Sequence, residues 1–242
     1  MIELSNKKVE QWKKTIDAIS GFLGEGNFRF NDKGVFFKAM DPSQVVLIDS
    51  HIEPSIFDKY KVEPSFIGLD LNELSKIMNR ILPEDKLKME ITDSEFLINL
   101  EGELNRSFSL PLIDVHDDDV KLPQHSADAT VEINSRILKE ALKDASLFGS
   151  SVVLSVKNNE FSIGAKGSQG TLNSIAKQAS KISVKSTKDV TTKFSLNFLQ
   201  NIVKEADPTK KITLELKNEA PMRVTYQIGK SPIVFHLAHM IL

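Results

Sequence analysis

The sequence predicts an α+β fold of two topologically similar halves, each with two helices packed on antiparallel sheets. Three observations support this prediction. The residue pattern of the first half recurs in the second at an offset of 125 to 127, strand-like alternation outnumbers helical periodicity, and a proline-bounded acidic segment lies near the midpoint. We therefore predict an N-terminal domain at 1–110, an interdomain connector at 111–124 and a C-terminal domain at 125–242.

The connector reads PLIDVHDDDVKLPQ. Its four aspartates within six positions, from Asp114 to Asp119, put too much like charge together for a buried strand. It also carries regularly placed Leu, Ile and Val residues, which a freely flexible Gly/Ser tether lacks. The composition indicates a crossover that runs over the surface.

Four segments have the apolar spacing of amphipathic helices, and they match in pairs. Segment 9–20 matches 136–146, and 70–81 matches 195–206. The first helix starts near Lys7, with Trp12, Ile16, Ile19 and Leu23 as its apolar stripe. We predict Asp70 and Ser195 as N-caps of the second pair, and either Ser5 or Asn6 as the cap of the first helix.

The rest of each half reads as short strands. Residues 28–40 form a hairpin that matches 154–166, residues 45–52 form a further strand, and prolines bracket an irregular or short helical segment at 54–64. Period-two alternation marks strands around 87–91, 96–100, 212–216 and 224–228. The polar segment 171–187 reads as one or two exposed strands, which gives eight or nine strands in each half.

Composition is that of an ordinary globular chain, with 40% hydrophobic and 26% charged residues and a net charge of -2. The absence of cysteine excludes disulfides, thiolate zinc sites and thiol nucleophiles, and it fits a reducing compartment. The start of the sequence has no basic, apolar leader, and no apolar run approaches the roughly 18 residues of a membrane span. We expect a soluble protein inside the cell.

Catalytic and metal patterns are weak. His236 and His239 fall on opposite faces of an extended segment, so they are unsuited to one metal. The run Asp117–Asp119 lacks the glycine and the later bidentate glutamate of a calcium loop. Gly164, Gly167 and Gly170 read as a turn, because no Walker lysine pattern accompanies them, and no G-x-S-x-G occurs. We predict no metal, no cofactor and no enzymatic activity.

Residues 34–49, GVFFKAMDPSQVVLID, resemble the signature segment of the DNA sliding clamp family, that of proliferating cell nuclear antigen. Further segments follow in the family's order, namely SIFDKY, LDLNELSKIM, PLIDV, LKDASL, APMRVTYQI and HLA. The resemblance covers essentially the whole chain. The residues of the PLIDV and KDAS segments, and the lack of an acidic C-terminal extension, are closer to archaeal than to eukaryotic members.

The resemblance implies the DNA clamp fold, with three identical or paralogous subunits that close into a ring around duplex DNA without reading its sequence. It implies that DNA polymerase, clamp loader, nuclease and ligase bind the ring through short peptide motifs. The location would be cytoplasmic, at the nucleoid, in an archaeon and nuclear in a eukaryote. A checkpoint-type clamp subunit or a non-DNA scaffold of the same fold remains the alternative, because fold alone does not fix function.

A ring around DNA needs a basic lining. The four predicted helices carry a net charge of +4, so the remainder of the chain carries -6. On an amphipathic helix such charges are otherwise a solvated face. With the resemblance, we predict DNA contacts from Lys8, Lys13, Lys14, Lys76, Arg80, Arg136, Lys139, Lys143, Lys204, Lys210 and Lys211.

Two protein interfaces follow from the resemblance. Subunits would join edge to edge through Arg106, Phe108 and Leu110 of one copy and Ser174, Ile175, Lys177 and Ile182 of the next. Partner motifs with a glutamine and two aromatic residues would bind Met40, Gln44, Val45, Leu47, Val120, Leu122, Pro221, His236, Leu237 and Ala238. Relatives usually follow the Leu-Ala pair with proline and a basic residue, whereas this chain has His239 and Met240, which alters the backbone and the charge beside the site.

Overall fold

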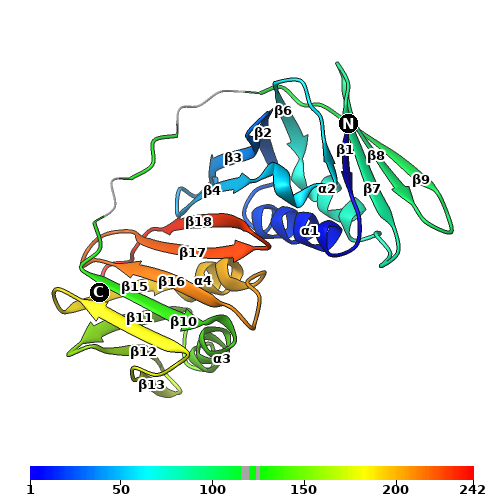
Figure 1. The fold of residues 1–242 in the computed structure, drawn as a ribbon. Helices are drawn as coiled ribbons and strands as arrows, with labels where there is room; N and C mark the ends of the chain where they lie inside the picture. Colours follow the sequence, from blue (N-terminus) through cyan, green and yellow to red (C-terminus); the bar gives the residue numbers. More distant parts are fainter. Residues whose placement is uncertain (116–119, 124–125) are drawn as a thin grey trace. The chain divides into compact units, whose positions relative to one another are not determined.

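The computed structural model describes residues 1–115, 120–123 and 126–242. Within these residues it has 18 strands and four α-helices, which form two compact units (Figure 1). The described residues of Met1–Pro42, Ile48–Val120 and Gln227–Ile233 make up unit 1. Those of Ser43–Leu47, Lys121–Tyr226 and Val234–Leu242 make up unit 2.

The first half of the chain folds in the order β-α-β with the second helix after the sixth strand. Its elements are β1 (Ile2–Leu4), α1 (Lys7–Ser20), β2 (Glu25–Asn31), β3 (Gly34–Met40), β4 (Val46–Ile52), a short 3₁₀ turn (Pro54–Ile56), β5 (Lys59–Tyr60), β6 (Ser65–Asp70), α2 (Leu71–Met78), β7 (Lys86–Ile91), β8 (Glu95–Glu101) and β9 (Arg106–Pro111). Strands β5-β1-β7-β8-β9 form a five-stranded sheet with β9 at one edge, and β2 pairs with both β3 and β6.

The second half repeats this order. Its elements are β10 (Ala129–Asn134), α3 (Ser135–Ala145), β11 (Ser151–Lys157), β12 (Glu160–Gly167), β13 (Gly170–Ala176), β14 (Ile182–Ser186), β15 (Val190–Ser195), α4 (Leu196–Val203), β16 (Lys211–Leu216), β17 (Met222–Ile228) and β18 (Ser231–Leu237). Strands β13-β12-β11-β15 form a four-stranded sheet with β13 at one edge, and β14-β10-β16-β17 pair in that order. The predicted α+β class, the four helices and the strand content are confirmed, and segment 171–187 holds two strands.

Asn6, Asp70 and Ser195 occupy N-cap positions as predicted, but only Asp70 caps its helix with a side-chain hydrogen bond. The Asp70 carboxylate accepts the Glu73 N–H at 2.9 Å, as predicted. Ser195 occupies the N-cap position of α4, but its side chain makes no capping hydrogen bond. Neither Ser5 nor Asn6 caps α1 with its side chain, because Ser5 donates instead to the Asp58 carboxylate at 2.6 Å. Tertiary partners compete with local caps for these short hydroxyl side chains.

The two helices of each half pack on each other and fill the core (Figure 1). Trp12, Ile16 and Ile19 of α1 are buried, as the predicted stripe requires. The Ser75 hydroxyl of α2 donates to the Asp17 carboxylate of α1 at 2.8 Å. At the equivalent place in the second half, the Gln200 amide of α4 donates to the Leu142 carbonyl at 3.2 Å. The repeat therefore keeps a polar link between the helices but changes its chemistry.

The start of the connector is fastened to unit 1. The Ile113 N–H donates to the Gly68 carbonyl at 3.0 Å, and the two residues form an antiparallel bridge on the open side of β6. A Cβ atom on residue 68 would lie 2.7 Å from Ile113 Cγ1 and 2.8 Å from its carbonyl oxygen. Only glycine allows the connector to approach β6 this closely.

We expect Gly68→Ala to lower the free energy of unfolding of unit 1 by about 1–3 kcal/mol, since the connector and β6 must move apart. Trp12 is the only tryptophan and is buried in unit 1, so its fluorescence during urea unfolding follows this unit. Gly21→Ala is the control, because a Cβ there meets only the Asp17 carbonyl oxygen at 3.6 Å. Equal urea midpoints for both variants would contradict this account of Gly68.

Candidate nucleic-acid and protein interfaces

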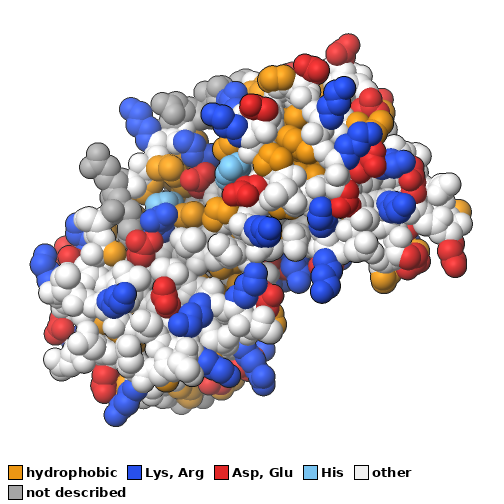
Figure 2. All heavy atoms as spheres, viewed as in Figure 1, with side chains coloured by type: hydrophobic (Ala, Val, Ile, Leu, Met, Phe, Trp, Pro, Cys, Tyr) orange, Lys and Arg blue, Asp and Glu red, His pale blue; other side chains and the backbone are white. Residues whose placement is uncertain are grey.

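Most predicted DNA-contacting cations form ion pairs in the folded chain. Lys76 pairs with Glu73 at 2.6 Å and Lys143 with Glu140 at 2.8 Å on their own helices. The further pairs are Lys14–Glu10, Lys204–Glu205 and Lys211–Glu132, at 3.4, 4.0 and 3.7 Å. Figure 2 accordingly shows Lys and Arg side chains interspersed with Asp and Glu on the viewed face. Such exposed pairs are weak, so these cations stay available to an external anion.

Two predicted cations have structural partners that hold them. Lys8 Nζ contacts the Asp58 carboxylate at 2.8 Å and donates to the Phe57 carbonyl at 3.0 Å. The hydrogen bond from Lys8 to the Asp58 carboxylate, with a second from the Ser5 hydroxyl, keeps the pKa of the Asp58 carboxyl below its usual value. Lys8 thus ties α1 to the segment that precedes β5.

Lys139 is held in the second half. Its Nζ donates to the carbonyls of Lys204 and Ala206 at 2.8 and 2.7 Å, just past the end of α4. Carbonyls at a helix C-terminus lack intrahelical donors and carry partial negative charge. A lysine there donates to these carbonyls and offsets their negative charge. Lys139 therefore fixes α3 to α4, which spacing along α3 alone does not reveal.

Lys13, Arg80 and Arg136 form no side-chain ion pair among the described residues. Arg80 and Arg136 are exposed, and Lys13 is half-buried. Arg80 lies just after α2, and Arg136 is in the first turn of α3. Within the predicted set, these three side chains are therefore the ones without an ion pair among the described residues.

Strand β9 lies at the edge of its sheet, and its first residue, Arg106, is turned inward to pair with Asp85. Arg106 donates through Nη1 to the Arg80 carbonyl at 2.7 Å and through Nη2 to the buried Asp85 carboxylate. Asp85 also accepts the Leu82 N–H at 2.7 Å. The pair anchors the start of β9 to the loop after α2. Inward-pointing charge on an edge strand discourages indiscriminate strand pairing.

Phe108 lies on the core-facing side of β9. It pairs across the sheet with the buried Ile98, yet remains half-exposed because no strand lies beyond it in the described residues of the five-stranded sheet. Leu110, also on this side, is 9% exposed. Leu104 and Leu82 flank the strand and are 67% and 45% exposed. This edge therefore combines unpaired backbone with apolar side chains.

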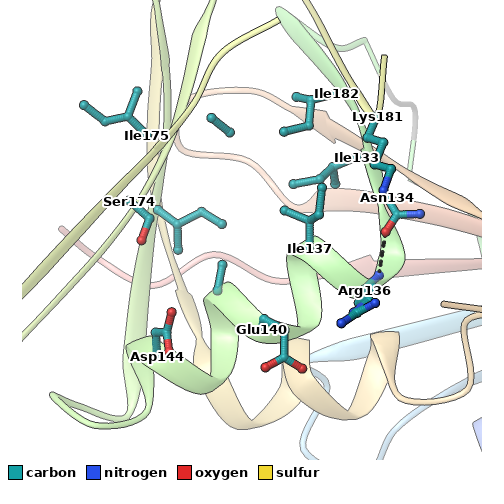
Figure 3. Close-up of a pocket in the computed structure, with 13 residues that line it drawn as sticks. Ile133, Asn134, Arg136, Ile137, Glu140, Asp144, Ser174, Ile175, Lys181 and Ile182 are labelled. Carbon is teal, nitrogen blue, oxygen red and sulfur yellow. Dashed lines mark hydrogen bonds between the residues drawn. The ribbon is translucent and has the colours of Figure 1, made fainter. Parts of the chain in front are cut away.

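The other open edge, β13, borders a cavity of about 510 Å³ between itself, α3 and the start of β14 (Figure 3). Ser174 pairs with Ile163 and points toward α3, whereas Ile175 points away from the cavity and is 54% exposed. The remaining lining combines apolar residues with charges of both signs: Ile133, Ile137, Ala141, Ile163, Ala176 and Ile182, with Asn134, Arg136, Glu140, Asp144 and Lys181. Lys177 is exposed and lies 3.7 Å from Glu160.

The predicted partner-binding residues divide between surface and core. In unit 2, Gln44 has a left-handed backbone with φ of 58°, and the Val45 carbonyl accepts the Ala238 N–H at 2.8 Å. Leu122 is 45% exposed and Pro221 is exposed. Leu47, His236 and Leu237 are buried, so they support this surface from beneath. In unit 1, Met40 is 39% exposed and Val120 is half-buried.

The alternative sites find little support. Gly167 and Gly170 pair at the β12–β13 turn, as predicted for a turn. No three His, Asp or Glu residues that could hold a metal gather in the part of the chain that the structure describes. Asp117–Asp119 lie outside the described residues. No α-helix in the described ranges is both long enough and apolar enough to cross a membrane.

Several residues of these surfaces were missed by sequence reasoning. In the sequence, Glu140 and Asp144 enter only the net charge of a predicted helix, and no pattern singles out Asp85 or Leu82. The repeat contains one indication of this. Asp17 accepts a hydrogen bond from Ser75, and in the second half Asp144 stands in the place of Asp17 while Gln200 stands in the place of Ser75. Gln200 bonds to backbone instead, which leaves Asp144 at the cavity.

A duplicated unit with two unlike open edges and cation-bearing helices defines the DNA clamp class of fold. The N-terminal domain model of proliferating cell nuclear antigen matches residues 1–120, and the C-terminal domain model matches residues 121–241. The chain belongs to the proliferating cell nuclear antigen family.

Curated relatives agree with this assignment. A protein of Pyrococcus furiosus called DNA polymerase sliding clamp is 32% identical over 93% of this chain and 92% of its own length. One of the same name from Pyrococcus abyssi is 31% identical over 98% and 97%. A solved proliferating cell nuclear antigen from Thermococcus kodakaraensis superposes with a TM-score of 0.92 at 20% identity, covering 99% of both chains. One from Entamoeba histolytica gives 0.90 at 23%, covering 99% and 98%.

We expect Lys139→Met to lower the free energy of unfolding by about 1–2 kcal/mol, because two carbonyls lose a charged donor while the aliphatic stem is kept. Amide hydrogen exchange should quicken in α4 and at residues 204–206. Lys143→Met, on the same helix, should change stability by no more than about 0.5 kcal/mol. Unchanged exchange in α4 of the Lys139 variant would show that the cap is dispensable.

Proposed function

We propose that this chain is a DNA polymerase sliding clamp, a processivity factor whose copies close into a ring around duplex DNA and tether replication and repair enzymes. One observation carries the proposal: β9 of the first half and β13 of the second, which are not counterparts in the repeat, both stand at the edge of a sheet. A head-to-tail contact between unlike edges propagates from copy to copy and closes when the rotation per copy fits a ring.

The repeat supplies a template for this contact. By order in the repeat, β4 corresponds to β13 and β18 to β9. The ends of β4 and β18 lie together, because the Ala238 N–H donates to the Val45 carbonyl and the Glu53 N–H donates to the Ser231 hydroxyl. Their counterparts β13 and β9 each pair with one strand, β12 and β8, and have no second neighbour in the described residues. Another copy of the chain can provide it.

The direction of the side chains on each edge strand determines which residues would meet in this contact. Phe108 on β9 and Ser174 on β13 both face the helix side of their sheets, since they pair with Ile98 and Ile163. If the two edges pair, Phe108 enters the apolar cavity beside α3 of the next copy. Arg106 stays paired with Asp85, and the cavity carries charges of both signs, so the contact would rest on the aromatic side chain rather than on charge. An aromatic anchor in an apolar pocket is a usual centre of a stable interface.

The charge of the chain favours pairing of unlike halves. Residues 1–115 carry 14 Lys and Arg against 20 Asp and Glu, a net of -6. Residues 126–242 carry 16 against 10, a net of +6. Two first halves repel each other, and so do two second halves, whereas a first half attracts a second half. Charge therefore disfavours the symmetric dimer and favours head-to-tail association of unlike halves.

DNA would be held by the helices through phosphate contacts alone. The proposed contacts come from Lys13, Arg80 and Arg136, with the ion-paired lysines of α1 to α4 as a reserve of mobile charge, while Lys8 and Lys139 hold the helices in place. Loosely held cations suit a ring that must move along DNA, because no contact selects a base. The role requires no catalysis, and we propose a cytoplasmic location at the nucleoid.

Phe108→Ala should raise the dissociation constant between subunits about 30-fold, because it removes an aromatic anchor worth about 2 kcal/mol. Light scattering over a dilution series measures this constant and the mass of the assembly. Phe66→Ala, a half-buried aromatic of unit 1 on β6, is the matched control. If both variants dissociate as the parent does, the subunits join elsewhere.

Charge reversal of Lys13, Lys76 and Arg80 to Glu should weaken retention on closed circular DNA without altering the mass of the assembly. The logarithm of affinity falls with the logarithm of salt by about 0.9 per phosphate contact, so the triple variant should show a shallower slope. Reversal of Lys33, Lys38 and Lys61, which changes the net charge equally, is the control. Equal losses in the two variants would indicate only a general charge effect.

The same assay separates the alternatives. A sliding clamp placed by a loader stays on circular DNA and leaves linear DNA through its ends. A non-DNA scaffold shows no retention on either, and a checkpoint-type subunit requires paralogous chains to assemble. Hydrolysis of ATP or DNA by the purified chain would reopen the enzymatic hypothesis.

A further inference from the structure

Cations of two kinds accompany α1, α2 and α3. One lysine on each helix forms an ion pair with a glutamate of the same helix, and these lysines are Lys14, Lys76 and Lys143. Another cation at each helix forms no ion pair among the described residues, namely Lys13 on α1, Arg80 just after α2 and Arg136 on α3. The same combination of a paired and an unpaired cation therefore occurs at three helices.

The glutamate precedes its lysine by about one helical turn in all three pairs. The distances between carboxylate oxygen and ammonium nitrogen are 3.4 Å for Glu10–Lys14, 2.6 Å for Glu73–Lys76 and 2.8 Å for Glu140–Lys143. This order is the favourable one on a helix, because it agrees with the helix dipole. The hydrogen bond from Lys76 to the Glu73 carboxylate also raises the pKa of the Lys76 ammonium.

Duplication of the chain does not account for this recurrence. At the repeat offset of 125 to 127, Glu10 corresponds to one of residues 135–137 and Glu73 to one of residues 198–200. Neither stretch contains an acidic residue. The pairs of the two halves are therefore not copies of each other, and a carboxylate beside a helix lysine recurs without being carried over by the repeat.

A carboxylate beside a lysine opposes the binding of that lysine to DNA in two ways. The ammonium group must leave or share its carboxylate before it meets a phosphate, and the carboxylate repels the phosphate directly. Lys76 and Glu73 are 70% and 50% exposed, so both are open to an approaching anion. An exposed pair of this kind is weak, so a phosphate can displace the carboxylate and the lysine can return to it.

We propose that Glu10 and Glu73 compete with DNA phosphates for Lys14 and Lys76, and that they thereby limit how tightly the clamp holds duplex DNA. This inference rests on the proposed function. The two glutamates are positioning residues, since they act through the lysines. A lysine that returns to its carboxylate after each phosphate contact makes no long-lived contact, and this favours movement of the ring along DNA. Glu140 lines the cavity beside β13, so its removal would also affect the proposed subunit contact.

The double variant Glu10→Gln with Glu73→Gln tests the competition, because glutamine keeps the side-chain length and a similar helix propensity. Fluorescence anisotropy with the full chain and a short linear duplex measures the affinity. The variant should bind about tenfold more tightly than the parent at low salt, since each weak pair that no longer competes contributes about threefold. Its affinity should also fall more steeply with salt, because the freed lysines exchange counterions for phosphates.

A matched control removes two ion-paired carboxylates from strands. Glu101 and Glu215 pair with Lys88 and Arg223 at 2.8 and 3.1 Å, and their joint replacement by glutamine changes the net charge equally. This control should bind the duplex as the parent does. Equal gains in the two double variants, or no gain in the helix variant, overturn the competition and leave the helix glutamates as stabilisers of their helices.

A double-mutant cycle shows whether Glu73 acts through Lys76. Glu73→Gln alone should tighten binding about threefold, and the gain should fall below about twofold when Lys76 is also replaced by glutamine. The same gain in both backgrounds would mean that Glu73 only repels phosphate, which contradicts the competition. A parent that is retained by a loader on circular DNA but shows no gain on loss of the glutamates overturns this inference alone. A parent that neither binds the duplex nor is retained overturns the proposed function and the inference with it.

Discussion

Unpaired backbone at the edges of sheets is the constraint on which this structure depends. Every edge strand exposes N–H and C=O groups that must find partners in water, in side chains or in another strand. The chain treats its edges in different ways. β6 and β15 each receive a single bridge from a segment that has just left a sheet, through Ile113 and Met240. β9 and β13 have one strand neighbour each among the described residues, β8 and β12, and in the ring that we propose their outer edges pair with other copies.

An assembly edge must be open to one partner and closed to all others. Arg106 meets this need on β9, because it faces inward and is held by the buried Asp85. Burying such a pair costs desolvation energy, and its benefit is specificity of pairing. In the proposed contact, selectivity on β13 would come from the cavity beneath the strand, which an apolar group of another copy would fill beside α3. Backbone pairing then supplies affinity, and the side chains supply register.

Sequence reasoning succeeded where a pattern extends over many residues. Helical spacing placed Trp12, Ile16 and Ile19 in the core, and the repeat located all four helices. It was less reliable where one atom has several competing partners. The Ser5 hydroxyl bonds to Asp58 rather than to the helix, and Lys139 caps α4 although its spacing suggests a solvent-facing cation. These choices depend on residues more than 50 positions away, so no local pattern contains them.

Duplication explains why the two halves can be alike in fold and unlike in use. After β9 the chain continues as the connector, and after β18 it continues as residues 238–242, from equivalent positions. Ile113 must be covered closely, and Gly68 permits this by having no side chain. Lys193 stands in the place of Gly68, and it holds the end of the chain by its ammonium group and one bridge. The exchange of glycine for lysine therefore changes how the segment after the last strand is held, from close backbone packing in the first half to an added side-chain hydrogen bond in the second.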